Sequence, residues 1–390
     1  MSTMAPERPK TAGPKGGKEA QAVRRPFVVG SRRVDKATYD QSRAFTASTQ
    51  DLPTYECDPN GFLSGLYLLV ENVTAGNAAA VTFAEDGPFI AIDTITLNDT
   101  NNKPLVGPMT GWDLYIAVKF GGYAFSDDTR ESSVFSITTG AGATGGSFTF
   151  VLRIPVELVH RDGLGSLPNK SSSATFDVSI RLSANAAIYG VAPTTPGTVR
   201  VRLQQFGWMD PNPTDMRGNP VAQNPPAIQT TQYWSKQTYT IAFGAFSQRL
   251  QGIDSLLRNM IFILRDSSAT PRVNGDLNFP DPFTVLYETS TPIQRLKTIW
   301  RHMIAEVFGY KATTVGTGGR ENGVYPEPFN VDFGLKPGAE SRLGYLPSSS
   351  STTVNMSGTQ GSTGTGPGVF GVLVNKVVPA DGNPMLLSGR

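Results

Sequence analysis

Short apolar stretches separated by turn residues fill most of the chain, and several of them have the two-residue period of a strand. "SFTFVLRIPVELV" from Ser147, "TVRVRLQQFGW" from Thr198, "FNVDFGL" from Phe329 and "VFGVLVNKVV" from Val369 alternate apolar and polar residues over much of their length. Such alternation is typical of antiparallel sheets that turn one face toward a core. Gly (41 residues) and Pro (29 residues) are plentiful between these runs. The pattern predicts an all-β chain with many short strands.

The chain also contains an internal repeat. The string "FLSGLYLLVEN" from Phe62 matches "LLRNMIFILRD" from Leu256 in its order of apolar, small and charged residues, at an offset of 194. "GPFIAI" and "DPFTVL" follow in the same order at the same offset. "TGWDLYIAVKFGGY" and "TIWRHMIAEVFGY" come next, with Trp112 and Trp300 separated by 188 positions. Three matched elements in one order at nearly one offset indicate a tandem duplication.

The first two matched elements are predicted to be strands, and the third is predicted to be a helix in each copy. Trp112 and Trp300 are interpreted as structural anchors that hold these helices on the sheets. In the second copy, apolar residues at three- and four-residue spacing form one broad face, namely Ile293, Leu296, Trp300, Met303, Ile304 and Val307.

Both predicted helices have start and stop signals. Gly121 and Gly309 are expected to end them in left-handed conformations. The predicted N-terminal groups are Thr110 as N-cap with Asp113 three residues later in the first copy, and Thr291 as N-cap with Pro292 and Gln294 in the second.

A repeating unit of about 150 to 190 residues with many short strands and one helix fits an eight-stranded jelly roll. The predicted fold is therefore all-β, with two tandem eight-stranded jelly-roll barrels or sandwiches, each carrying a short flanking helix. The predicted divisions are a basic flexible arm at residues 1–37, a first jelly roll at 38–236 and a second at 237–390. The Pro/Asn-rich stretch from Met209 is either the connection or an outer loop of the first unit.

Charge is distributed unevenly along the chain. Residues 1–37 carry nine Lys/Arg and three Asp/Glu, a net charge of +6, whereas the remainder carries −4. A basic, Pro/Gly-rich leader on a mildly acidic body is typical of a disordered arm that binds an anionic surface, either nucleic acid or lipid headgroups. A solubilising tail without a partner is the alternative.

Residues 1–30 lack the apolar core of a signal peptide, and no apolar run reaches the length of about 18 residues that spans a bilayer. The lone Cys57 excludes an intramolecular disulfide, as expected for a protein that folds in a cytoplasm. Cys57 itself is interpreted as a small apolar residue.

No residues are predicted as catalytic, cofactor-binding or metal-binding. "GAGATGG" from Gly140 matches a dinucleotide fingerprint, but a strand follows it where the fingerprint needs a helix, so a turn is predicted. The two histidines, His160 and His302, are placed in a turn and on a helix, which does not suit a double cupin. A glycosidase pair of carboxylates is left open, because any Asp and Glu could meet in space.

The first unit resembles a known family of viral proteins. "GFLSGLYLLVENVTA" from Gly61, "FAEDGPFIAIDTITLND" from Phe83 and "TGWDLYIAVKF" from Thr110 resemble the first barrel of a major capsid protein. The family is that of tailless bacteriophages with an internal membrane, the tectiviruses, within the adenovirus-like double jelly-roll lineage. The resemblance covers residues 55–125, and beyond them it depends on architecture and length.

The resemblance implies a non-enzymatic virion protein without a cofactor. Three chains would form a homotrimer of six barrels that contacts neighbouring capsomers, vertex proteins and minor capsid proteins. Arg24, Arg25, Arg32 and Arg33 would contact headgroups of the viral membrane, in preference to packaged DNA. The alternatives are a secreted two-jelly-roll protein that binds or hydrolyses glycans, and a pentameric vertex or minor shell protein of the same fold.

Overall fold

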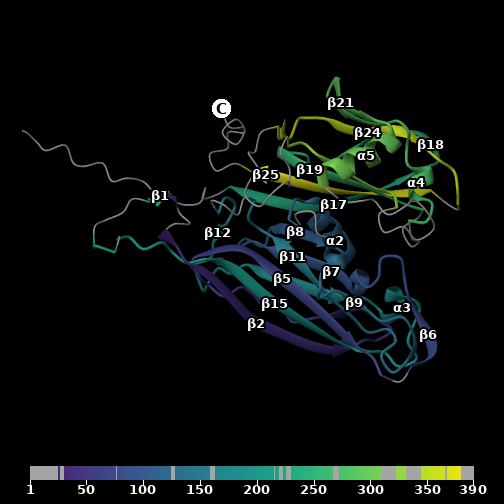
Figure 1. The fold of residues 1–390 in the computed structure, drawn as a ribbon. Coiled ribbons are helices and arrows are strands. Elements are labelled where there is room, and N and C mark those ends of the chain that lie inside the picture. The colour runs from purple at the N-terminus through teal and green to yellow at the C-terminus, as the bar shows by residue number, and fades with distance from the viewer. Residues whose placement is uncertain are drawn as a thin grey trace, which may run out of the picture.

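The fold comes from a computed structural model of the 390-residue chain, shown in Figure 1. Strands dominate it, and α-helices are short. The residues described are 25–26, 30–75, 77–123, 128–158, 163–214, 216–218, 223–224, 230–266, 272–308, 322–330, 344–364 and 367–378.

Two sheets form the first barrel. One sheet has the order β2-β15-β5-β11 and the other β8-β7-β13-β3, with β4 (Tyr55–Glu56) extending β3 along β13. Counted one to eight along the chain, the strands run 1-8-3-6 in the first sheet and 5-4-7-2 in the second, which is the order of a jelly roll. The eight strands are β2 (Arg33–Ala44), β3 (Gln50–Asp51), β5 (Phe62–Val73), β7 (Ile92–Asn98), β8 (Pro104–Met109), β11 (Phe148–Pro155), β13 (Asp177–Leu182) and β15 (Thr198–Trp208).

The second barrel repeats this order strand by strand. Its sheets are β17-β25-β19-β22 and β21-β20-β24-β18, which again run 1-8-3-6 and 5-4-7-2. The prediction of two tandem eight-stranded jelly rolls is confirmed. The strands are β17 (Thr231–Ile241), β18 (Gly244–Arg249), β19 (Ser255–Arg265), β20 (Phe283–Tyr287), β21 (Ser290–Arg295), β22 (Val324–Pro328), β24 (Val354–Gln360) and β25 (Gly368–Val378).

Shorter elements fill the connections. The strands are β1 (Arg25–Pro26), β6 (Asn77–Phe83), β9 (Ser136–Ile137), β10 (Gly140–Gly142), β12 (Leu167–Pro168), β14 (Tyr189–Val191), β16 (Gln223–Asn224) and β23 (Leu346–Ser348). The helical turns are η1 (Phe89–Ala91), η2 (Thr129–Glu131), α3 (Asn185–Ile188) and α4 (Gly275–Asn278). "GAGATGG" lies in β10 and the turn that precedes β11, so the prediction of a turn is confirmed.

One predicted strand differs from the observed structure, and another lies mostly outside the described residues. The second is "FNVDFGL", of which only Phe329 and Asn330 are described, directly after β22, a neighbour of β19 that ends at Pro328. Phe329 follows it and donates its backbone N–H to the Arg258 carbonyl at 3.1 Å. In "GPFIAI", η1 precedes β7, whereas the matched "DPFTVL" is a strand from Phe283. The two copies therefore agree more closely in strand order than in local backbone conformation.

Helix α2 (Gly111–Phe120) begins as predicted. The Thr110 side chain accepts a hydrogen bond from the Asp113 N–H at 3.1 Å, and the Asp113 carboxylate accepts one from the Thr110 N–H at 3.1 Å. This reciprocal pair is a capping box. Gly121, however, has a φ of −91°, so the predicted left-handed end is wrong for this helix. Gly309 lies outside the described residues.

Helix α5 (Lys297–Phe308) begins later than predicted. Thr291, Pro292 and Gln294 belong to β21, where pairing with β20 takes precedence over the capping signal. The first turn of α5 receives its acceptor from a different segment, because the Lys297 N–H donates to the Asp281 carboxylate at 3.2 Å. The hairpin of β20 and β21 therefore determines where α5 begins, and the capping signal at Thr291 was misleading.

The two barrels pack directly on each other. β17 pairs with β25 in the second barrel and also contacts β8 of the first through Trp234 and Val106, so that one ten-stranded sheet passes through both. Figure 1 shows α2 between β17 and the sheets of the first barrel. One cluster of buried apolar side chains contains residues of both barrels. The molecule has a continuous core across the junction.

Two strands lie near the predicted divisions of the chain. β2 begins at Arg33, inside the range predicted as the arm. β17 spans positions 236 and 237, where the sequence placed the boundary between jelly rolls. By strand order β2 and β17 are the first strands of their barrels.

Candidate functional site: the junction between the barrels

The junction places α2 of the first barrel on the outer face of β19 in the second. Alternate residues of a strand point to opposite faces, and both faces of β19 are buried. On the outer face, the Asn259 amide donates to the Phe120 carbonyl at 2.7 Å, and the Arg265 guanidinium lies 4.8 Å from the Trp112 ring. On the inner face, Phe262 packs against Phe283 in the core of the second barrel. β19 therefore joins two hydrophobic layers.

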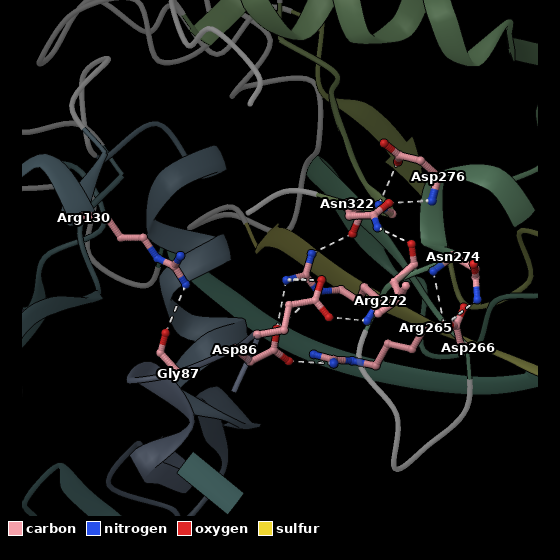
Figure 2. Close-up of polar contacts among 12 residues, drawn as sticks. Asp86, Gly87, Arg130, Arg265, Asp266, Arg272, Asn274, Asp276 and Asn322 are labelled. Atoms are coloured by element: carbon pink, nitrogen blue, oxygen red, sulfur yellow. Dashed lines mark hydrogen bonds and ion pairs between the residues drawn. The ribbon is translucent and has the colours of Figure 1, made fainter. Parts of the chain in front are cut away.

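Arg272 is the centre of a buried ionic cluster at this junction, shown in Figure 2. It is fully buried, and its guanidinium donates to Asp86 at 2.9 Å and to the Asn322 carbonyl at 2.6 Å. Its backbone N–H donates to the Glu85 carboxylate at 2.6 Å. Arg265 binds the other Asp86 oxygen at 2.6 Å. The acids come from the first barrel and the arginines from the second, so the cluster fastens one to the other.

Trp112 forms the apolar floor of this cluster. The Arg272 guanidinium lies 4.3 Å from its ring, and that of Arg265 lies at 4.8 Å. A cation over the face of an indole ring is attracted by its quadrupole, most strongly where water is excluded. Trp112 is fully buried, and its ring faces residues of the second barrel.

The two acids of the cluster respond differently to burial. Burial opposes ionisation of Asp86, but the Arg265 and Arg272 guanidiniums together outweigh it and hold the pKa of Asp86 below its ordinary value. For Glu85, burial dominates over the attraction of Arg272 and raises the pKa. Asp86 is therefore the firmly ionised partner of the two arginines.

The cluster continues into the second barrel through polar side chains. The Asn322 side chain accepts from the Asp276 N–H at 2.8 Å and donates to the Val273 carbonyl at 2.7 Å, as Figure 2 shows. Asp276 also pairs with Arg301 of α5. A chain of contacts therefore connects the ionic cluster to α5, whose last residue, Phe308, also packs against Phe120 at the end of α2.

The other end of α2 is held by a second polar group. The Arg258 guanidinium donates to the Gly121 carbonyl at 2.9 Å and to Asn375 at 3.0 Å. The Tyr123 hydroxyl donates to Gln232 at 2.7 Å and accepts from the Trp234 indole N–H at 3.1 Å. These bonds satisfy polar groups that the junction buries, which keeps their burial from being costly.

Trp300 is also buried, but its ring lies within its own barrel. Its indole N–H donates to the Pro326 carbonyl at 2.9 Å. Four aromatic rings surround it, with centroids 5.2 to 6.1 Å away, namely Phe262, Phe279, Phe283 and Tyr325. The two tryptophans that the repeat matched are therefore both buried, in different settings.

A cavity of about 740 Å³ opens at the junction. Both acidic and basic side chains line this cavity. The buried Asp113 carboxylate among them is paired with the Lys236 ammonium at 2.6 Å. Among the described residues, no three His, Cys, Asp or Glu side chains are arranged to hold a metal ion. The charged lining includes Glu85, Asp86, Asp93, Asp113, Lys236 and Arg265.

The histidines and the cysteine that the sequence singled out form no common site among the described residues. His302 is exposed on α5 and pairs with Glu306 at 3.2 Å, while His160 lies outside the described residues. Cys57 is fully buried, and burial together with nearby acids raises the pKa of its thiol to about 12. In the described part of the chain, no helix has the length and hydropathy to cross a membrane.

The four predicted surface arginines lie at the beginning of the chain. Arg24 lies outside the described residues, and Arg25 is placed only as part of β1. Arg32 and Arg33 are exposed at the start of β2, and Arg33 lies 4.0 Å from Asp35. At that distance and exposure the ion pair leaves Arg33 accessible to solvent.

The sequence did not reveal the junction. Asp86 and Arg272 are 186 positions apart, and a loop residue carries no sign of its partner. One signal was available: Met260 to Leu264 of β19 are apolar without alternation, which is typical of a strand that is buried on both faces.

Solved viral structures share this architecture. The crystal structure of the STIV MCP aligns with a TM-score of 0.54 and 11% identity, over 88% of this chain and 96% of that one. The atomic structure of Sulfolobus Turreted Icosahedral Virus gives 0.53 and 11%, over 91% and 95%. The fold is a double jelly roll. At this identity the likeness establishes the fold alone, and the sequence matches no protein-family model and no curated protein.

Proposed function

We propose that this chain is a major capsid protein that forms homotrimeric, pseudo-hexameric capsomers of an icosahedral viral shell. The observation that carries this proposal is the exact repetition of strand order, 1-8-3-6 and 5-4-7-2, in two barrels of one chain. Three such chains present six similar barrels around a threefold axis, which suits a lattice in which each capsomer has six neighbours. The shared fold of the STIV MCP over most of both chains supports it.

The built-in junction also favours a structural role. An ionic cluster, two polar groups and a shared core fix one barrel against the other. A rigid pair of barrels defines the angle between successive units, and a ring can close only if that angle is constant. Enzymes place perturbed, accessible groups in a cleft, whereas the buried ionic cluster around Arg272 holds the two barrels together.

The shell is proposed to enclose an internal membrane, as in the tectivirus-like lineage. The basic leader, with Arg24, Arg25, Arg32 and Arg33, would lie at the base of the capsomer against lipid headgroups. Each basic residue near an anionic surface contributes about 1 kcal/mol of attraction. The exposure of Arg32 and Arg33 supports this role. Neighbouring capsomers, vertex proteins and minor capsid proteins would be the other partners in the virion.

Size-exclusion chromatography with light scattering tests the assembly. We expect the purified protein to have three times the mass of one chain at micromolar concentration. A stable monomer would contradict the proposal, and a particle of five chains would assign the chain to the vertex.

Flotation with vesicles tests the membrane contact. Binding to vesicles that contain anionic lipid should fall when Arg24, Arg25, Arg32 and Arg33 are all replaced by Gln. The matched control replaces Arg200 and Arg202, which lie in the barrel wall and form ion pairs there. Equal binding by the two variants would contradict the contact.

A further inference from the structure

Three Asn-Gly pairs occur in the chain, namely Asn60-Gly61, Asn274-Gly275 and Asn322-Gly323. In such a pair the backbone nitrogen of the glycine can attack the side-chain carbonyl carbon of the asparagine, because glycine has no side chain to obstruct the approach. A C–N bond forms and closes a succinimide ring, and ammonia leaves. Water then opens the ring to aspartate or isoaspartate. The fold decides which of the three pairs can react in this way.

The pair Asn322-Gly323 is held at both reacting groups. The Gly323 N–H donates to the Asp276 carboxylate at 2.8 Å, so the attacking nitrogen is engaged. The Asn322 side chain is buried, accepts from the Asp276 N–H at 2.8 Å and donates to the Val273 carbonyl at 2.7 Å. Both groups must leave these bonds before they can react, which requires a local opening of the structure.

The pair Asn274-Gly275 is held in a similar way. The Gly275 N–H donates to the Arg272 carbonyl at 2.8 Å. The Asn274 amide donates to the Asp266 carboxylate at 3.2 Å. Arg272 is the buried centre of the ionic cluster at the junction, so the acceptor of the Gly275 N–H is fixed in place. This pair should therefore also react only after a local opening.

The pair Asn60-Gly61 has no such restraint on its reacting groups. It lies directly before β5, and Asn60 is half-buried. Among the described residues, neither the Asn60 side chain nor the Gly61 N–H has a hydrogen-bond partner. The neighbouring bonds use other groups: the Asn60 N–H donates to the Asn169 carbonyl at 2.5 Å, and the Gly61 carbonyl accepts from the Asn169 N–H at 2.8 Å. The attacking nitrogen and the carbon that it attacks are both free in the folded protein.

We propose that Asn60 is the residue at which the folded protein deamidates, and that the reaction places a new carboxylate at the root of the basic arm. Gly61 lies directly against the backbone of Trp208 and Met209, where a Cβ atom would be 2.2 Å from the Trp208 carbonyl oxygen. The Met209 N–H in turn donates to the Arg32 carbonyl at 2.8 Å. The site is therefore joined through one residue to the start of β2.

The new charge opposes the proposed contact with a membrane. Conversion of the Asn60 amide to a carboxylate lowers the net charge by one per chain, close to Arg32 and Arg33. Basic residues are attracted to anionic headgroups and a carboxylate is repelled by them, so the affinity for lipid falls as the protein ages. This effect on binding rests on the proposed function, whereas the reactivity of Asn60 does not.

Peptide mapping by mass spectrometry tests the site. The intact protein is incubated at mildly alkaline pH, which favours attack by the backbone nitrogen, and the acidic product is measured at all three pairs over time. We expect Asn60 to convert several-fold faster than Asn274 and Asn322 in the folded protein, and at a similar rate in guanidinium chloride. Equal or slower conversion of Asn60 in the folded protein would overturn the assignment.

Asn60→Gln is the matched variant, because attack on the longer side chain must close a larger ring, which forms more slowly. It should remove the acidic product that appears first, and persistence of that product would place the reaction elsewhere. Gly61 is unsuitable for substitution, because its φ is +62° and a side chain would collide with the Trp208 carbonyl.

Flotation with anionic vesicles tests the effect of the charge. Asn60→Asp carries the charge of the product and should bind less than the wild type. Thr194→Asp adds the same charge to an exposed position before the other end of β15 and should bind as the wild type does. Equal binding by the two variants would overturn the effect of position. If the wild type does not bind, the membrane contact fails together with this effect, and the peptide map alone judges the reactivity of Asn60.

Discussion

The helices α2 and α5 occupy the same place in the strand order of their barrels but have different surroundings. α2 is buried on all sides, between its own sheets and β19. α5 buries Trp300, Ile304 and Phe308, meets the first barrel where Phe308 packs against Phe120 with ring centroids 5.2 Å apart, and leaves Ile299 exposed. A helix that is buried all round needs partners on every face, and α2 has them whereas α5 keeps one face in solvent. The packing of the two copies, and not the repeat itself, therefore decides how much of each matched helix is buried.

The largest expected effect compares the two tryptophans. Trp112→Ala and Trp300→Ala should each lower the unfolding free energy by about 3 to 5 kcal/mol, the usual cost of removing a large buried ring. Loss of Trp300 empties the aromatic core of the second barrel, whereas loss of Trp112 removes the floor under Arg265 and Arg272. Calorimetry should show one lowered unfolding transition for Trp300→Ala and two separate unfolding transitions for Trp112→Ala.

A single transition in Trp112→Ala, lowered as in Trp300→Ala, would contradict this difference. It would mean that α2 belongs to the stability of its own barrel alone. Phe246→Ala is a suitable control for a partly buried ring, because Phe246 packs against Phe370 away from the junction.

The next largest effect concerns the buried ionic cluster. Arg272→Met should destabilise the protein by about 3 to 5 kcal/mol, because the buried Asp86 and Glu85 carboxyls are then left with Arg265 as the remaining cation of the cluster. Arg200→Met removes an exposed partner of Asp40 and should have a much smaller effect, because solvent screens an exposed ion pair. Urea unfolding of both variants measures the contrast. Equal losses would show that the cluster is no stronger than a surface pair.

The same cluster makes a prediction about pH. The pKa of Asp86 is depressed in the folded state, so its stabilisation is complete above the ordinary pKa of about 3.9 and is lost as pH falls through the folded value. Asp86→Asn should therefore be less stable at pH 7 and should lose less on acidification than the wild type. Urea unfolding between pH 3 and 7 checks the slope, and equal slopes would contradict the role of Asp86.

Glu85 should act in the opposite direction. Its pKa is raised, so the folded state binds this proton more tightly, and the resulting stabilisation is lost as pH rises through the folded pKa. Removing the group with Glu85→Gln should leave a steeper loss of stability on acidification than in the wild type. A shallower loss in the same titration would show that the assignment is reversed.

The smallest effect separates a true helix cap from a false one. Thr110→Ala should cost about 1 kcal/mol, because the Asp113 N–H loses its acceptor. Thr291→Ala lies in β21, is exposed, and should change the unfolding free energy by about 0.5 kcal/mol or less. Denaturant midpoints of the two variants give the answer, and similar losses would restore Thr291 as a cap.

The sequence was most informative where the pattern repeats. Two pairs of matched segments predicted as strands, at an offset of 194, and one pair of matched helices, at an offset of 188, were enough to predict a duplicated jelly roll. The observed strand order confirms this prediction. The signal was strong because core-facing alternation and helix capping are local properties of the chain. Thr110 and Asp113 show this most directly, since their predicted capping box is present.

The rest could not be predicted because it depends on contacts between distant segments. Thr291 has a capping sequence, but pairing with β20 makes it part of a strand. Trp112 and Trp300 are matched in sequence, yet one faces the neighbouring barrel and the other its own core. Asp86 and Arg272 have no local signal of each other. A duplication reveals which elements correspond, but the packing of the two copies decides what each corresponding residue does.

Electron microscopy of the purified protein tests the central claim most directly. If the barrel junction within the chain is repeated between chains, averaged particles should have a hexagonal outline with six similar barrels around a threefold axis. Isolated particles of two barrels, or a two-fold dimer, would contradict the claim.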